Sequence, residues 1–182
     1  MQYLTAVAVL SSGERAYITD ANNNNGTAKL YISSIYTSTC VMPELVHVQL
    51  AVFVVDVKSA HWALLASIPV GQLPFGPIAL TPDNRFAYVP TYGNSPGSSV
   101  FIISTCDNRV VGNITGFAGA QGAAVSPRGS LLYVAEFDGS SIKVISTATN
   151  TVALTFRSSD SAHPFNFPGA IALNAKVLIQ LY

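Results

Sequence analysis

The sequence of 182 residues contains an internal repeat. The segment GPIALTPDNRFAYV aligns with QGAAVSPRGSLLYV, and this alignment places Tyr88 and Tyr133 45 residues apart. The segments that follow, which begin at Ser98 and Ser140, are identical at seven of seventeen positions. A repeat of this length means that one supersecondary unit recurs along the chain, and that each copy buries its apolar face against its neighbours.

Two further copies of the first half flank this pair. AVAVLSSGERAYIT begins at Ala6 and places Tyr17 at the position of Tyr88, while PGAIALN begins at Pro168. Apolar runs rich in Val, Ile, Tyr and Phe alternate with clusters of Gly, Pro, Asn, Asp and Ser, a pattern that is typical of short strands. Strands are predicted at about 6–9, 16–19, 28–32, 52–57, 63–68, 78–80, 87–89, 100–104, 110–114, 123–125, 131–135, 142–146, 152–156, 170–173 and 176–181.

A unit of about 45 residues with four short strands has the size of one β-propeller blade, in which four antiparallel strands stack on neighbouring blades around a channel. The sequence therefore predicts an all-β fold with four-stranded antiparallel blades of β-propeller type. We expect one domain over residues 1–182, with blades at roughly 1–70, 71–115 and 116–157 and a partial blade at 158–182. The glycine-rich stretch from Gly112 to Gly122 lacks the spacing of a phosphate-binding motif and is predicted to be a loop.

The repeat resembles the YVTN family of β-propellers over about residues 71–156. The matching stretches are 79–89, 124–134, 145–152 and 68–71. The tetrad that names the family occurs here as Tyr-Ile-Thr-Asp at 17–20, Tyr-Val-Pro-Thr at 88–91 and Tyr-Val-Ala-Glu at 133–136. The resemblance implies that the tyrosine packs between blades and that the fourth position opens a loop on the ligand side. It also implies an extracytoplasmic or cell-surface location, although we identify no export signal.

In propellers of this kind, the loops that enter the innermost strand and those that leave the second strand gather around the mouth of the channel. The repeat register therefore predicts one ligand-binding face. Phe137, Phe165 and Phe167 add aromatic rings there that are able to stack on a sugar or hold a peptide. The candidate ligand-binding residues are Asp20, Phe75, Tyr92, Gln121, Glu136, Asp138 and His163.

Two hypotheses account for the acidic residues of this face. Asp20, Glu136, Asp138 and His163 would make an oxygen-rich metal site like that of propeller lactonases, in which a cation polarises a carbonyl group and activates water. Alternatively, these residues cap their own turns and face water. The sequence favours the turns, so we assign no metal and no other cofactor. No motif for a catalytic nucleophile is present, and we name no catalytic residue.

Composition limits the partners. Nine basic and nine acidic residues give zero formal charge, whereas domains that bind nucleic acids carry an excess of basic residues. We therefore predict no nucleic-acid partner. The apolar run at 50–55 ends at Asp56 and is far shorter than a membrane span.

We therefore predict a binding or scaffold module for a protein or glycan ligand, with a metal-dependent lactonase as the alternative. Three whole blades leave two faces bare, so pairing with a second copy or membership of a longer chain is expected. Whether the glycosylation sequons at Asn25 and Asn113 are used stays open.

Overall fold

The computed structural model describes residues 4–20, 51–58, 62–70, 73–93, 97–157, 166–173 and 179–181, and the predicted strand at 28–32 lies outside them. These residues form fifteen strands and no helix, and so none that could cross a membrane. The strands are β1 (Leu4–Val9), β2 (Arg15–Asp20), β3 (Ala51–Asp56), β4 (Ala63–Pro69), β5 (Leu73–Pro74), β6 (Ala79–Leu80), β7 (Phe86–Tyr92), β8 (Ser98–Ser104), β9 (Arg109–Phe117), β10 (Ala120–Val125), β11 (Leu131–Glu136), β12 (Ser141–Ser146), β13 (Thr151–Arg157), β14 (Ile171–Leu173) and β15 (Ile179–Leu181).

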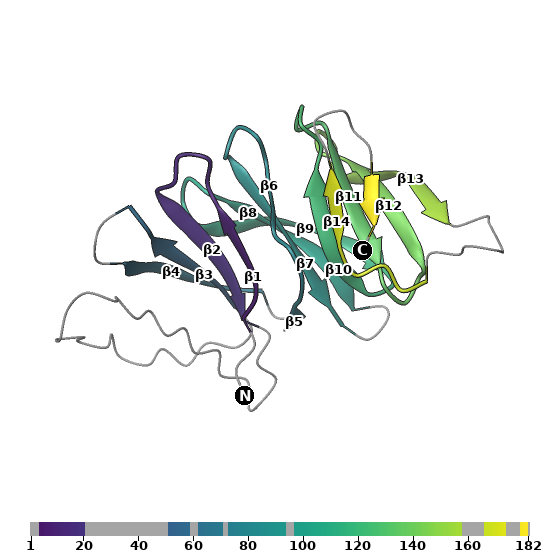
Figure 1. The fold of residues 1–182 in the computed structure, drawn as a ribbon, viewed down its shortest axis with the longest axis horizontal. Helices are drawn as coiled ribbons and strands as arrows, with labels where there is room; N and C mark the ends of the chain where they lie inside the picture. The colour runs from purple at the N-terminus through teal and green to yellow at the C-terminus, as the bar shows by residue number, and fades with distance from the viewer. Residues whose placement is uncertain are drawn as a thin grey trace.

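The strands form four antiparallel sheets, which we call blades 1 to 4 (Figure 1). Blade 1 has the order β1-β2-β3-β4, and blade 3 has the order β10-β11-β12-β13. In blade 2 the short strands β5 and β6 both pair with β7, which is followed by β8 and β9. Blade 4 consists of β14 and β15 in the described residues. The predicted all-β fold with four-stranded antiparallel blades is confirmed.

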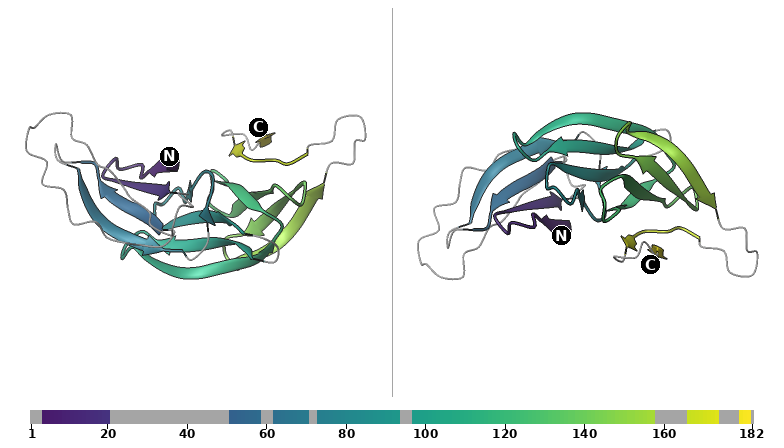
Figure 2. Two further views of the ribbon diagram at one scale, coloured as in Figure 1. Left: turned by 90° about the horizontal axis from the view of Figure 1, so that it is seen from below. Right: turned by 90° about the horizontal axis from the view of Figure 1, so that it is seen from above.

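The blades lie side by side along an arc (Figure 2). The first strands, such as β1 and β14, lie on its concave side, whereas the last strands β4, β9 and β13 form its convex side. Because each blade presents one face to the preceding blade and the other to the following one, the apolar core is divided into layers between blades.

The repeat tyrosines occupy equivalent buried positions, as predicted. Tyr17, Tyr88 and Tyr133 lie on the second strand of consecutive blades and are 0%, 2% and 6% exposed. In each blade the residue directly opposite on the first strand is an alanine, whose small side chain leaves room for the ring. The pairs are Ala8↔Tyr17, Ala79↔Tyr88 and Ala124↔Tyr133.

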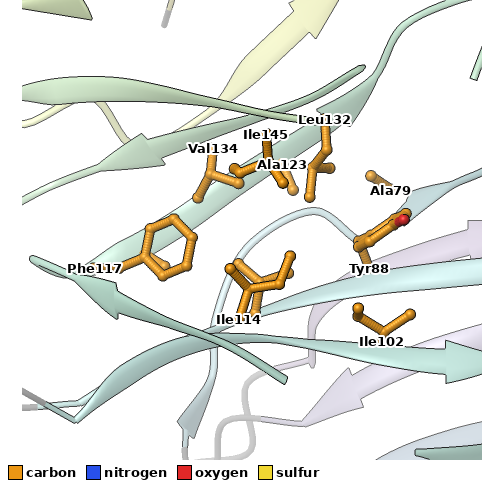
Figure 3. Packing of buried hydrophobic residues seen from close by; sticks show 11 residues of the cluster. Ala79, Tyr88, Ile102, Ile114, Phe117, Ala123, Leu132, Val134 and Ile145 are labelled. Atoms are coloured by element: carbon orange, nitrogen blue, oxygen red, sulfur yellow. The ribbon is translucent and has the colours of Figure 1, made fainter. Parts of the chain in front are cut away.

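Along the second strands, successive apolar side chains pack on the two opposite faces of a blade. On β7, Ala87 and Val89 pack in the cluster between blades 1 and 2, whereas Tyr88 packs in the cluster between blades 2 and 3. On β11, Leu132 and Val134 face Tyr88 across this second cluster, as Figure 3 shows. Since successive strand residues point to opposite faces, an apolar run of three or four residues is what a strand buried on both sides requires.

The prediction of a loop from Gly112 to Gly122 is wrong. β9 continues to Phe117 and β10 begins at Ala120, so only residues 118–119 connect the two strands. Phe117 and Ala120 belong to the cluster between blades 2 and 3, and their burial stabilises the strands despite the glycines. At Gly112 a Cβ would lie 3.1 Å from Ile102 Cδ1, so the glycine leaves room for that side chain within the strand. The strand β5 was also not predicted, because it has only two residues.

Candidate functional site

The predicted ligand-binding residues of blades 2 and 3 lie at one end of the sheets. The pairs Leu73↔Tyr92 and Ala120↔Glu136 place the start of each blade beside the end of its second strand. We call this end the loop face. The β6–β7 turn at 81–85 and the β10–β11 turn at 126–130 lie at the opposite end, which we call the turn face.

Tyr92 and Asp138 meet across the junction of blades 2 and 3. The Tyr92 hydroxyl donates a hydrogen bond to Asp138 Oδ1 at 3.3 Å. This hydrogen bond, more than partial burial, raises the pKa of Tyr92, because the carboxylate stabilises the protonated phenol. Gly119 lies directly beneath the pair with a φ of +74°, and a Cβ there would be 2.7 Å from Asp138 Oδ2. Glycine is therefore required at this position for the two side chains to approach the backbone.

Gln121 lies between the entry segments of blades 2 and 4. A Cβ on Gly76 would be 1.8 Å from the Gln121 carbonyl oxygen, and a Cβ on Gly169 would be 3.3 Å from Gln121 Oε1. Phe75, next to Gly76, is 39% exposed, and its N–H donates to the Pro90 carbonyl at 3.3 Å. Phe75 and Gln121 thus belong to adjoining parts of the loop face.

Phe137 and Phe167 form an aromatic pair between blades 3 and 4. Their ring centroids are 5.0 Å apart with an interplanar angle of 41°. Phe167 is 58% exposed, has a φ of 53°, and approaches Ser140 Oγ with its N–H at 3.5 Å. The pair holds one ring of blade 3 against the segment that leads into β14, and it leaves much of the Phe167 ring open to solvent.

Glu136 points into the protein rather than out of the loop face, and it is 2% exposed. Its Oε1 accepts a hydrogen bond from the Ala118 N–H at 2.8 Å and lies 2.9 Å from Lys143 Nζ. Its Oε2 accepts the Ser141 hydroxyl, and Lys143 also donates to the Gly116 carbonyl. The chain's own groups therefore engage both oxygens, and Glu136 fastens the β9–β10 connection to the β11–β12 hairpin.

Lys143 was not predicted as a site residue from the sequence. Its only signal is a lone cation within the apolar strand β12, a position that requires a partner because an unpaired buried charge is costly.

Of the four residues of the metal hypothesis, the structure describes the side chains of Glu136 and Asp138 only. Asp20 ends β2, where its backbone pairs with Leu4, but its side chain is outside the described part, as is the whole of His163. Glu136 is bound to Lys143, and Asp138 accepts from Tyr92. Among the described residues, no group of three or more His, Cys, Asp or Glu side chains is arranged to hold a metal ion.

No protein-family model and no curated protein matches the sequence. Solved structures match the fold. A chain of the hydrazine synthase of Kuenenia stuttgartiensis aligns with a TM-score of 0.70 and 18% identity over 96% of this chain. U3-55K and the WD40 repeats of RRP9 each align with a TM-score of 0.63 and 15% identity over 94%. This chain spans 40% of the first structure's chain and 42% of the other two. The likeness establishes a β-propeller-type fold, while membership of the YVTN family stays a prediction.

Proposed function

We propose that this chain is a β-propeller binding module that holds a segment of a protein partner on the loop face. The observation that carries the proposal is the continuity of this face across three blades. Tyr92 joins blade 2 to Asp138 of blade 3, and Phe137 of blade 3 joins Phe167 ahead of blade 4. Aromatic residues of this kind are enriched among the residues that dominate protein interfaces.

The chemistry of the face favours a peptide over other ligands. Phe75 and Phe167 offer exposed rings for apolar side chains, and Gln121 and Asp138 offer acceptors for peptide N–H groups. The single carboxylate at the Tyr92–Asp138 pair favours a segment that carries a cation or an N–H donor nearby. The WD40 repeats of RRP9 have a similar fold, but a fold alone assigns no partner.

The experiment is a peptide-display selection on the immobilised chain, followed by measurement of Kd for the enriched peptides. The double variant Phe137→Ala/Phe167→Ala should weaken their binding at least about tenfold, because interface aromatics contribute most of the binding energy. Trp62→Ala is the matched control: its ring is 54% exposed, but it lies between β3 and β4, at the turn-face end of blade 1. The proposal would be overturned if the enriched peptides bound the double variant as tightly as they bind the Trp62→Ala control. Retention on a glycan array without any peptide selected would favour a glycan ligand.

A second copy of the chain is the partner that we propose for the outer part of the face that blade 3 turns toward blade 4. On the last strand β13, three apolar side chains are 43%, 50% and 43% exposed, and exposed apolar patches of this kind mark interaction surfaces: Val152, Leu154 and Phe156. Sedimentation should give a mass above 19.2 kDa that falls in the variant Leu154→Lys. A monomer at all concentrations would contradict this association. An extracytoplasmic or surface location rests on the YVTN resemblance alone and stays a prediction.

A further inference from the structure

Hydrogen bonds close the turn face at the junction of blades 1 and 2. The Ser11 N–H donates to Asn84 Oδ1 at 3.1 Å, and Asn84 Nδ2 donates to Ser11 Oγ at 2.5 Å. The Arg15 guanidinium reaches across the same junction to the Thr105 carbonyl at 2.8 Å.

The next junction lacks these bridges. In the repeat register, Pro82 takes the position of Ser11. Gly129 takes that of Asn84, and Phe86 takes that of Arg15. A Cβ on Gly129 would lie 3.3 Å from Pro82 Cδ, so these two positions also face each other across the junction. Proline has no N–H, glycine has no side chain and phenylalanine carries no charge, so none of the three contacts can form.

A cavity of about 250 Å³ is present between blades 2 and 3 where the bridges are missing. Phe86 and Tyr88 form an aromatic wall, and Thr147 contributes a hydroxyl that donates to the Gly129 carbonyl at 2.6 Å. Asp83 of blade 2 and Arg128 of blade 3 also line the cavity. The cavity lies on the turn face and shares no residue with the loop face.

The two charged residues of the cavity do not pair with each other in the described structure. Asp83 Oδ1 accepts the Thr81 hydroxyl at 2.6 Å and the Arg85 N–H at 3.0 Å. These bonds hold the pKa of Asp83 below its usual range, so the carboxylate is ionised at neutral pH. In the described residues, Asp83 Oδ2 and the Arg128 guanidinium have no hydrogen-bond partner and are therefore available to a ligand.

We propose that this cavity binds a small zwitterion, a free amino acid or a dipeptide, with its ammonium group on Asp83 and its carboxylate on Arg128. The guanidinium fork matches a carboxylate, and an ammonium group supplies the donors that the Asp83 oxygen lacks. The ligand's apolar side chain lies against Phe86 and Tyr88. A volume near 250 Å³ is below the roughly 300–1,000 Å³ of drug-sized pockets, which suits a ligand of this small size.

The first experiment titrates the protein with free phenylalanine, free leucine and the dipeptide glycyl-leucine, followed by NMR chemical shifts. N-acetylphenylalanine and phenylalaninamide, which each lack one charge, should bind at least about tenfold more weakly than phenylalanine. D83N keeps the Oδ1 acceptor of the turn, and R128Q keeps a polar side chain without the charge. Each variant should weaken phenylalanine binding by a similar factor, with D83N leaving N-acetylphenylalanine unchanged and R128Q leaving phenylalaninamide unchanged.

The second experiment closes the cavity. P82S together with G129N should restore the serine–asparagine bridge of the first junction, since asparagine already occupies a left-handed backbone position at Asn84, where φ is 57°. This double variant should retain the circular dichroism spectrum of the wild type and lose phenylalanine binding. The proposal is overturned if no zwitterion shifts any resonance, if the capped derivatives bind as well as phenylalanine, or if the folded double variant binds as the wild type does.

Discussion

The hydroxyl of Tyr17 in blade 1 donates a hydrogen bond to Asn108 Oδ1 in the β8–β9 turn of blade 2, at 3.0 Å. The same bond recurs one junction further along, where Tyr88 donates to Asn150 Oδ1 at 3.4 Å. Both asparagines have a φ of 54°, a conformation that places the amide above the tyrosine of the preceding blade. The repeat therefore encodes a polar tether between blades as well as an apolar layer.

Removing the tether should cost stability without disturbing packing. Tyr17→Phe keeps the ring and removes the hydroxyl, so the free energy of unfolding should fall by about 0.5–1.5 kcal/mol. Tyr133→Phe is the control, because the Tyr133 hydroxyl has no such partner in the described residues, and its effect should stay within about 0.5 kcal/mol. Urea unfolding of both variants measures the difference, and equal losses would show that the bond to Asn108 contributes nothing.

Stability should decline in alkaline solution through these buried tyrosines. Burial raises the pKa of both Tyr17 and Tyr88 above the ordinary value of 10.0. The unfolded chain therefore loses these protons first, and the stability they contribute is present below pH 10.0 and is lost as pH rises through the folded pKa. The double variant Tyr17→Phe/Tyr88→Phe should show a flatter decline in denaturant midpoint above that pH. A decline identical to that of the wild type would contradict the assignment.

The contact between Tyr92 and Asp138 should be visible in the titration of the phenol. Asp138→Asn removes the charge that favours the protonated form, so the pKa of Tyr92 should fall toward its ordinary value. Ultraviolet difference spectra of the variant, with Tyr92→Phe as the reference that removes the signal, measure this shift. Asp107→Asn changes an exposed carboxylate in the β8–β9 turn and should leave the titration unchanged.

Glu136 and Lys143 should behave as a coupled pair. Glu136→Gln or Lys143→Met alone leaves one largely buried charge without its partner, which costs roughly 3–5 kcal/mol. The double variant should recover much of that loss, because no charge remains uncompensated. A double-mutant cycle in urea measures the coupling free energy, and additive losses would mean that the two side chains act independently.

The sequence predicted the features that depend on local repetition and failed where a contact depends on a group from another strand or another blade. The positions of Tyr88 and Tyr133 follow from the repeat register, and the antiparallel hairpins place Tyr92 and Asp138 at one end. The inward turn of Glu136 was not predictable, because it depends on Lys143 from another strand and on the Ala118 N–H of the β9–β10 connection.

The cavity was missed for a similar reason. The replacements at Pro82, Phe86 and Gly129 are visible in the aligned repeats, but only the structure shows that these positions face one another across a junction. Among the glycines that made residues 112–122 look like a loop, Gly119 and Gly122 are explained by close contacts, whereas Gly116 has open space and a φ of +85°. Composition alone does not distinguish a glycine needed for space from one needed for a turn.

The two junctions differ in where polar side chains bridge them. Between blades 1 and 2, the bonds of Ser11 and Arg15 resist shear at the turn face. Between blades 2 and 3, the Tyr92–Asp138 contact and the apolar layer hold the loop face together, and Tyr88 bonds to Asn150 nearer the opposite end. At the turn face, solvent therefore reaches the second junction at a place where the first junction is bridged.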